Sequence, residues 1–206
     1  MKIWPATGFG KLDVRGLTGG FVVGAVGFLA ATFFSSIALV PVHLAIPALA
    51  SFVGLLVVGP AAEELLRVTI LKKHQDLGLT PMTLLSFALG WFLAELGIKL
   101  LGGVDFRVSR FCGFDYVGSL QPLVLHAMYT YLSWVILKRS KNVLLAIGAT
   151  LSVHIMYNIS VLVSDILGMT FIEIDDLFTM LAFAVCLFFA SRLRKINPNV
   201  SGVAVD

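Results

Sequence analysis

Seven polar residues interrupt the apolar stretches of this sequence, and their types could together carry out hydrolysis. Glu63, Glu64 and Arg67 lie in one stretch, Glu95 in the next, His126 in a third, and His154 with Asn158 in a fourth. A carboxylate in a dry cleft can act as a general base near neutral pH. A neighbouring histidine can hold a water or move a proton, and a second histidine with an amide can donate hydrogen bonds to a developing oxyanion.

The same side chains could alternatively hold a metal. His126, His154 and Glu63 are ligand types that bind Zn²⁺, and zinc lowers the pKa of bound water to about 7. Either arrangement would hydrolyse an amide bond. No serine or cysteine lies at helical spacing from a base, so the sequence gives little support to covalent catalysis.

The composition places these residues in a membrane. The chain has 206 residues, of which 58% are hydrophobic and 13% charged, whereas soluble domains carry about 25% charged residues. A soluble domain, a disordered chain and a nucleic-acid-binding module are therefore excluded, and no nucleic-acid partner is expected. The net charge of +3 is small, and two cysteines make no disulfide framework.

Six stretches are long and apolar enough to be membrane-spanning helices, which need roughly 20 residues each. They are 16–40, 44–71, 82–101, 118–137, 143–163 and 177–191. We therefore predict an all-α fold, a polytopic integral membrane helical bundle of about six transmembrane helices. Residues 1–195 would form a single domain with the polar site on spans 2 to 5, and residues 196–206 a disordered cytosolic tail.

The distribution of positive charge predicts the orientation. Eleven of the 15 Lys and Arg residues fall on one side of the membrane if the spans alternate in direction. The positive-inside tendency then places both termini in the cytosol. Arg107 and Arg110, in the loop 102–117 on the opposite side, are the exception to this pattern.

The spacing along the helices predicts that the polar residues meet. At 1.5 Å per residue, Glu63, Glu95, His126 and His154 fall within about 8 Å of one depth in a core about 30 Å thick. Arg67 lies three and four residues after the two glutamates, and Lys99 lies four after Glu95, so each can form an ion pair along its own helix.

A repeat of small residues predicts close packing of the first span. Gly16, Gly20 and Gly24 recur every four residues, a spacing that lets two helix backbones approach each other.

Four short motifs resemble those of the PrsW family of intramembrane proteases. The motifs are Glu63-Glu64-Leu65-Leu66-Arg67, Trp91-Phe92-Leu93-Ala94-Glu95-Leu96, Pro122-Leu123-Val124-Leu125-His126-Ala127-Met128-Tyr129-Thr130 and His154-Ile155-Met156-Tyr157-Asn158. The family belongs to a superfamily with the CPBP and CAAX-processing endopeptidases and with the Aph scaffold subunit of γ-secretase. The chain departs from the family pattern in having Arg67 in place of lysine and Leu96 in place of asparagine. The CPBP motif is one residue longer between its acids and its arginine.

The resemblance implies a function and roles for the residues. It implies an endopeptidase of a prokaryotic cell membrane that cuts a membrane-anchored protein. Glu63 or Glu64 would activate water and His126 would assist. His154 with Asn158 would bind the oxyanion or a metal, and Glu95 would be a further polar group of the cavity.

Two other functions fit the same residues. A catalytically silent scaffold could use the polar cluster to hold the transmembrane helix of a partner. A proton- or ion-coupled transporter could use the carboxylates and histidines as relay groups, although such transporters usually show repeated halves that this sequence lacks. A structural ion pair between helices is the simplest alternative for Glu63, Glu64 and Arg67.

Overall fold

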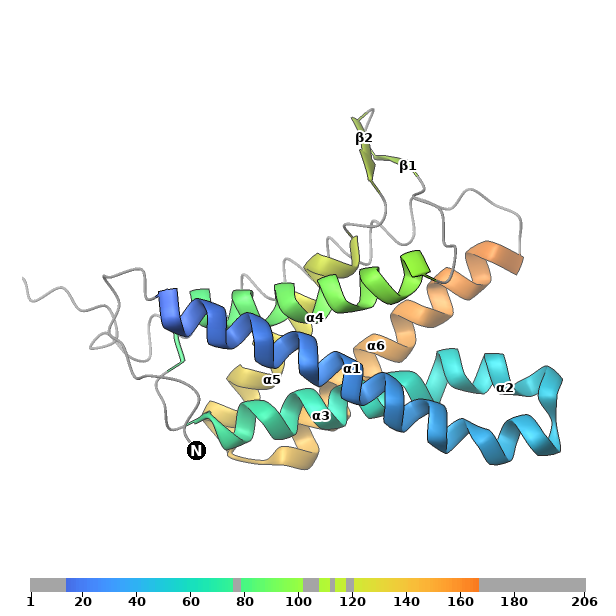
Figure 1. The fold of residues 1–206 in the computed structure, drawn as a ribbon, viewed down its shortest axis with the longest axis horizontal. Coiled ribbons are helices and arrows are strands. Elements are labelled where there is room, and N and C mark those ends of the chain that lie inside the picture. The colour runs from blue at the N-terminus through green and yellow to red at the C-terminus, as the bar shows by residue number, and fades with distance from the viewer. Residues whose placement is uncertain (1–13, 76–78, 102–107, 112–113, 118–120, 167–206) are drawn as a thin grey trace, which may run out of the picture.

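The computed structural model describes residues 14–75, 79–101, 108–111, 114–117 and 121–166, and its architecture is helical. The helices are α1 (Val14–Ala45), α2 (Pro47–Val53), the π-helical turn η1 (Gly54–Val58), α3 (Gly59–Lys73), α4 (Pro81–Leu101), α5 (Gln121–Ser140) and α6 (Val143–Ile166). Figure 1 shows α1 packed against both α4 and α3, with α5 and α6 completing the bundle. The all-helical bundle expected from the sequence is confirmed for these segments.

The predicted spans correspond closely to these helices. The second span is built from α2, η1 and α3, which follow one another without a loop. It begins just after Ile46, whose non-helical backbone precedes Pro47, because proline disfavours a helical conformation at the residue before it.

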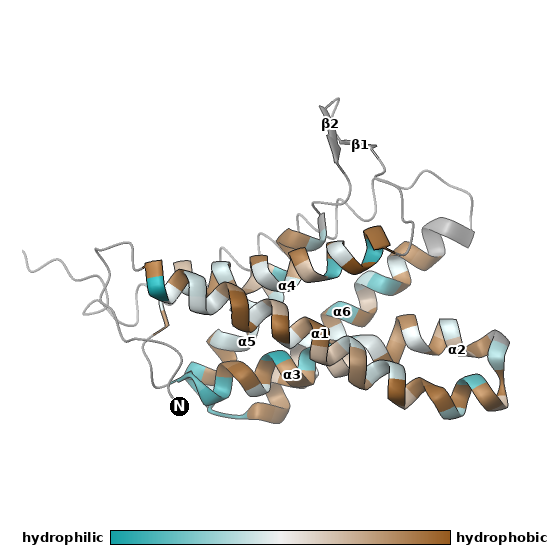
Figure 2. Cartoon of the chain, in the orientation of Figure 1, coloured by the Kyte–Doolittle hydropathy of each residue, from teal (hydrophilic) through white to brown (hydrophobic). Residues whose placement is uncertain are grey.

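Four segments in the described part of the chain are long and apolar enough to cross a membrane. They are Val14–Ala45, Leu49–Lys73, Pro81–Leu101 and Val143–Leu162. Helix α5 matches the expected fourth span in position but is more polar. Figure 2 shows hydrophilic segments within the otherwise apolar helices α3, α4 and α6. The expected sixth span (177–191) and the tail (196–206) lie outside the described residues.

The segment between α4 and α5 contains a β-hairpin that the sequence analysis did not predict. Strands β1 (Val108–Phe111) and β2 (Phe114–Val117) pair antiparallel, and Arg110 lies opposite Asp115 in the register.

The glycines of α1 bring its backbone against α4. A Cβ atom added to Gly24 would lie 2.0 Å from the carbonyl oxygen of Phe87, and one added to Gly90 would lie 2.0 Å from that of Phe21. Gly16, Gly20 and Gly24 are all buried, which confirms the predicted packing face. Gly90, on the partner helix, completes the contact.

Replacing Gly90 with alanine should therefore destabilise the bundle. The methyl group would force the two backbones apart, and we expect the free energy of unfolding in detergent micelles to fall by about 1–3 kcal/mol. Gly97→Ala on the same helix is the matched control, because nothing lies within 4 Å of its added Cβ. That variant should unfold like the native chain or later, since alanine favours helix. Equal destabilisation by the two substitutions would contradict the close contact.

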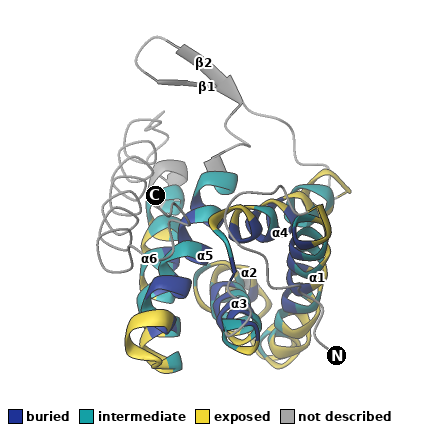
Figure 3. Cartoon of the chain, turned by 90° about the vertical axis from the view of Figure 1, so that its left-hand side faces the viewer, coloured by how far each residue is buried: buried dark blue, intermediate teal, exposed yellow. Residues whose placement is uncertain are grey.

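The core lies where α3 is enclosed by its neighbours. Figure 3 shows α3 in the middle of the bundle, with buried surface on the sides that face the other helices. Val68 and Leu71 of α3 pack in one apolar cluster with Phe87 of α4 and Leu137 of α5. This enclosure holds the charged residues of α3 at fixed positions between α4, α5 and α6.

Candidate functional site

A break in regular helix geometry precedes the glutamate pair. In η1 the N–H of Gly59 donates to the carbonyl of Gly54, five residues back, instead of four. Pro60 follows and has no N–H, so it cannot continue this pattern to Leu55. The π-helical turn adds one residue to the turn, which rotates the following helix and sets the direction in which Glu63 and Glu64 leave α3.

Arg67 is the centre of the polar cluster. Its guanidinium is completely buried and forms an ion pair with Glu64, which is also completely buried. A second nitrogen, Nη2, lies 3.7 Å from Glu63 Oε2 and 2.9 Å from Nδ1 of His126. The predicted pairing along α3 is confirmed, and the same arginine also links α3 to α5.

Two aromatic rings enclose the guanidinium. Its Cζ atom lies 4.6 Å from the centroid of the Trp91 ring and 5.4 Å from that of the Tyr129 ring. Trp91 also donates its Nε1–H to Glu63 Oε2 at 3.2 Å. The rings attract the cation through their π faces and keep it away from lipid.

His126 connects Arg67 to Glu95. Because arginine only donates, Nδ1 of His126 must accept, which leaves the proton on Nε2. Nε2 hydrogen bonds to Glu95, and Glu95 also forms the expected ion pair with Lys99. A chain of contacts therefore runs from the buried arginine to the half-exposed Lys99 and fixes one tautomer of His126.

His154 contacts the glutamate pair from α6. Its Nδ1 lies 3.0 Å from Glu64 Oε1, and its ring stacks on Tyr129 with the centroids 4.8 Å apart. With both histidines neutral, the three carboxylates and two cations of the cluster leave one net negative charge.

Asn158 lies apart from this cluster. Its Nδ2 donates to the carbonyl oxygen of Leu55 at 2.8 Å. In the π-helical pattern residue 60 would donate to this carbonyl, but Pro60 has no N–H. The Asn158 amide therefore supplies the missing donor. In this arrangement Asn158 joins α6 to η1, and its expected contact with an oxyanion stays a prediction.

Removing this amide should loosen the π-helical turn. We expect Asn158→Ala to lower the free energy of unfolding by about 0.5–1.5 kcal/mol and to speed amide hydrogen exchange in η1 and at Gly59. Exchange followed by mass spectrometry would measure this. Ser152→Ala is the control, because among the described residues the Ser152 hydroxyl bonds to the Gly148 carbonyl of its own helix. Unchanged exchange in η1 would show that Asn158 does not hold the turn.

The structure brings six of the seven sequence-predicted site residues into one network, as the depth argument predicted. They are Glu63, Glu64, Arg67, Glu95, His126 and His154. The sequence analysis did not predict the roles of Trp91 and Tyr129. Helical spacing offered the signal, because Trp91 precedes Glu95 by four residues and Tyr129 follows His126 by three.

The arrangement of donors does not fit a zinc ion. Both ring nitrogens of His126 are paired, one with the cationic Arg67 and the other with Glu95. A divalent ion shared by His126, His154 and Glu63 would have to displace that guanidinium, which already carries the positive charge of the site. Among the residues that the structure describes, no three His, Cys, Asp or Glu side chains are grouped as metal ligands.

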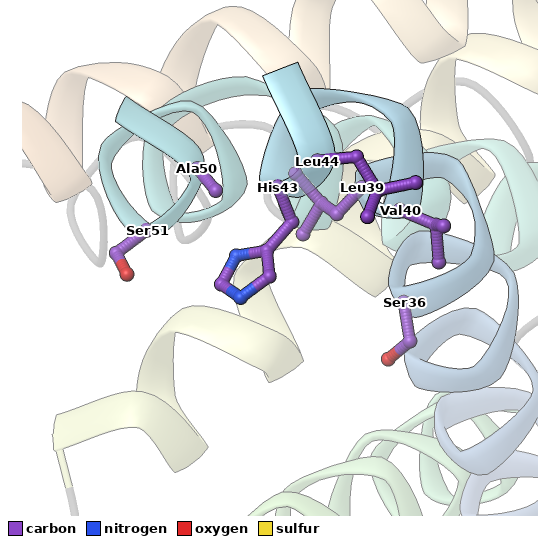
Figure 4. A pocket seen from close by; sticks show the side chains of 7 residues that line it. All are labelled: Ser36, Leu39, Val40, His43, Leu44, Ala50 and Ser51. Carbon is purple, nitrogen blue, oxygen red and sulfur yellow. The ribbon is translucent and has the colours of Figure 1, made fainter. Parts of the chain in front are cut away.

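A hollow of about 340 Å³ lies elsewhere, at the junction of α1 and α2 (Figure 4). It is lined by Ser36, Leu39, Val40, His43, Leu44, Ala50 and Ser51, and by no member of the polar cluster. The lining is mostly apolar. We therefore assign the candidate chemistry to the cluster around Arg67.

Comparison with protein-family models, with curated proteins and with solved structures finds no match to this chain.

Proposed function

We propose that this chain is a PrsW-like intramembrane endopeptidase that cleaves a membrane-anchored protein substrate with water activated by a glutamate. The observation that supports the proposal best is the single network in which three helices join two adjacent glutamates to two histidines, while a fourth helix adds Glu95. Placing charged groups within a membrane costs free energy, so charged groups that converge from several helices indicate a functional site.

Glu63 is the better candidate for the general base. Glu64 is completely buried, and its Oε1 is occupied by both Arg67 and His154. The Glu63 side chain is 18% exposed and lies farther from the guanidinium than Glu64 does. A substrate and a water can reach a carboxylate only where some of it is accessible, so we assign the proton transfer to Glu63.

In the proposed reaction a single glutamate, Glu63, first accepts a proton and later returns it. Glu63 takes a proton from water while the resulting hydroxide attacks the carbonyl carbon of the scissile peptide bond. The C–N bond of the tetrahedral intermediate then breaks, and the leaving nitrogen receives the proton from Glu63. His154, when cationic, could donate from Nε2 to the oxyanion while its Nδ1–H stays on Glu64. No step passes through a metal.

The orientation and setting belong to the same proposal. Six spans with both termini in the cytosol would place the Lys138–Arg139 end of α5 on the cytosolic side, in agreement with the positive-inside tendency. The family resemblance adds a prokaryotic cell membrane as the location.

A scaffold that binds the transmembrane helix of a partner is the second candidate. The observation in its favour is that Arg67, Glu64, His126 and Glu95 are linked to one another in the described structure. A buried network of this kind can lock helices together without doing chemistry.

A survey of new protein N-termini tests the proposal. Membranes from cells that express the native chain would be compared with membranes that hold an equal amount of Glu63→Gln. Termini found only with the native chain, within or beside spans of other proteins, are expected for a protease. Matching profiles under several stress conditions would overturn the proposal, and capture of the same partner by both forms would then identify a scaffold.

A further inference from the structure

Helix α5 carries three buried polar side chains whose oxygen atoms have no hydrogen-bond partner among the described residues. They are Tyr129, Thr130 and Ser133, each no more than 1% exposed. Two atoms of the central ion pair, Glu64 Oε2 and Arg67 Nε, are in the same condition. Buried polar groups without a partner cost free energy, so in native proteins they are usually bonded to something.

Other hydroxyl groups in the helices of this chain donate to a backbone carbonyl of their own helix. Thr150 in α6 is completely buried and donates to the carbonyl of Ala146 at 2.9 Å, and Thr32 donates to that of Phe28 at 3.1 Å. Thr130 and Ser133 have the same opportunity but make no such bond. Their hydroxyls therefore stay available to another partner.

These side chains lie on one face of α5. Ser133 follows Tyr129 by four residues and Thr130 by three, so the three stack along about one turn, or roughly 6 Å, of the helix. Helix α5 packs against α3, α4 and α6, and at the Tyr129 end the face meets His154 and the guanidinium of Arg67. Beyond Ser133 the helix is apolar as far as Leu137, which packs in the core cluster.

We propose that this face of α5, together with Glu64 and Arg67, binds internal water molecules beside the glutamate pair. A buried water makes about three hydrogen bonds, and hydroxyl and carboxylate oxygens one turn apart supply such partners. The use of this water rests on the proposed function, because hydrolysis consumes one water for each peptide bond cut. The binding of water does not rest on it.

Hydroxyl-radical footprinting of the full-length protein in lipid nanodiscs tests the inference. Radiolysis of a bound water creates a radical beside the side chains that hold it, so a buried residue next to water is oxidised. Tyr129 should be oxidised at least several times faster than Phe87, which is completely buried in the apolar cluster. A Tyr129 rate equal to that of Phe87 would overturn the proposal.

Variants with matched shapes locate the water. Thr130→Val and Ser133→Ala each remove a proposed partner and should slow the oxidation of Tyr129 severalfold. Thr150→Val removes a buried hydroxyl that bonds to its own helix, and it should leave that rate unchanged. Equal effects of Thr130→Val and Thr150→Val would contradict the assignment to α5.

The outcome can be separated from that of the proposed function. The same experiment on Glu63→Gln, which should not cleave substrate, is expected to give native oxidation of Tyr129. Oxidation of Tyr129 in a chain that cuts no substrate would leave the water site standing while the protease proposal fails. A cleaving chain with a protected Tyr129 would overturn the water site alone.

Discussion

Replacing Arg67 with alanine is expected to lower the free energy of unfolding by about 3–5 kcal/mol. Arg67 is completely buried and serves Glu64, Glu63 and His126 at once. Its removal would leave the carboxylate of Glu64 buried without its main counter-charge, and it would leave Trp91 and Tyr129 facing an empty space. Because folded proteins are stable by only about 5–15 kcal/mol, such a loss should also reduce the amount of folded protein in the membrane.

Chemical unfolding in detergent micelles, followed by tryptophan fluorescence, would measure this change. Lys99→Met is the matched control, since Lys99 also pairs with a glutamate but has a side chain that is 46% exposed. An exposed pair contributes about 0–1 kcal/mol, so this variant should unfold almost like the native chain. Removing both buried partners, as Arg67→Met with Glu64→Gln, should cost less than Arg67→Ala alone. An Arg67→Ala variant as stable as Lys99→Met would show that the buried network does not hold the bundle together.

The contacts within each helix could be predicted from the sequence, because 3.6 residues per turn place partners three and four residues apart. The pairing of Arg67 with both glutamates and that of Glu95 with Lys99 follow from this rule alone. The common depth of the polar residues required only the rise per residue and the alternation of the spans.

The contacts between helices could not be predicted in the same way. The direction of a side chain across the bundle depends on how each helix is rotated about its axis. In the second span the π-helical turn before Pro60 changes that rotation by one inserted residue. Apolar periodicity does not record such an insertion. For this reason the bridge from Arg67 through His126 to Glu95, and the bond of Asn158 to Leu55, emerged only from the structure.

The two adjacent glutamates should respond differently to the same substitution. Glu63→Gln is expected to lower the turnover of a cleaved substrate by about 10²–10⁴-fold, the usual contribution of a general base, while the folded state persists. Its carboxylate is partly exposed and lies 3.7 Å from Arg67, so its charge contributes little to stability. Glu64→Gln should instead destabilise the protein by about 3 kcal/mol or more, because it takes the nearest counter-charge from a buried guanidinium.

Turnover and unfolding measured on the same purified variants separate the two roles. Glu63→Asp keeps the carboxylate on a side chain one methylene shorter. This variant should retain more activity than Glu63→Gln, and the two variants should be equally stable. If Glu64→Gln abolishes turnover in a chain as stable as the native one, and Glu63→Gln does not, the base is Glu64. The substrate would then have to enter where Glu64 is now covered, between Arg67 and His154. Such a result would require the bundle to open between α3 and α6 during catalysis, since those two helices close over Glu64 in the described structure.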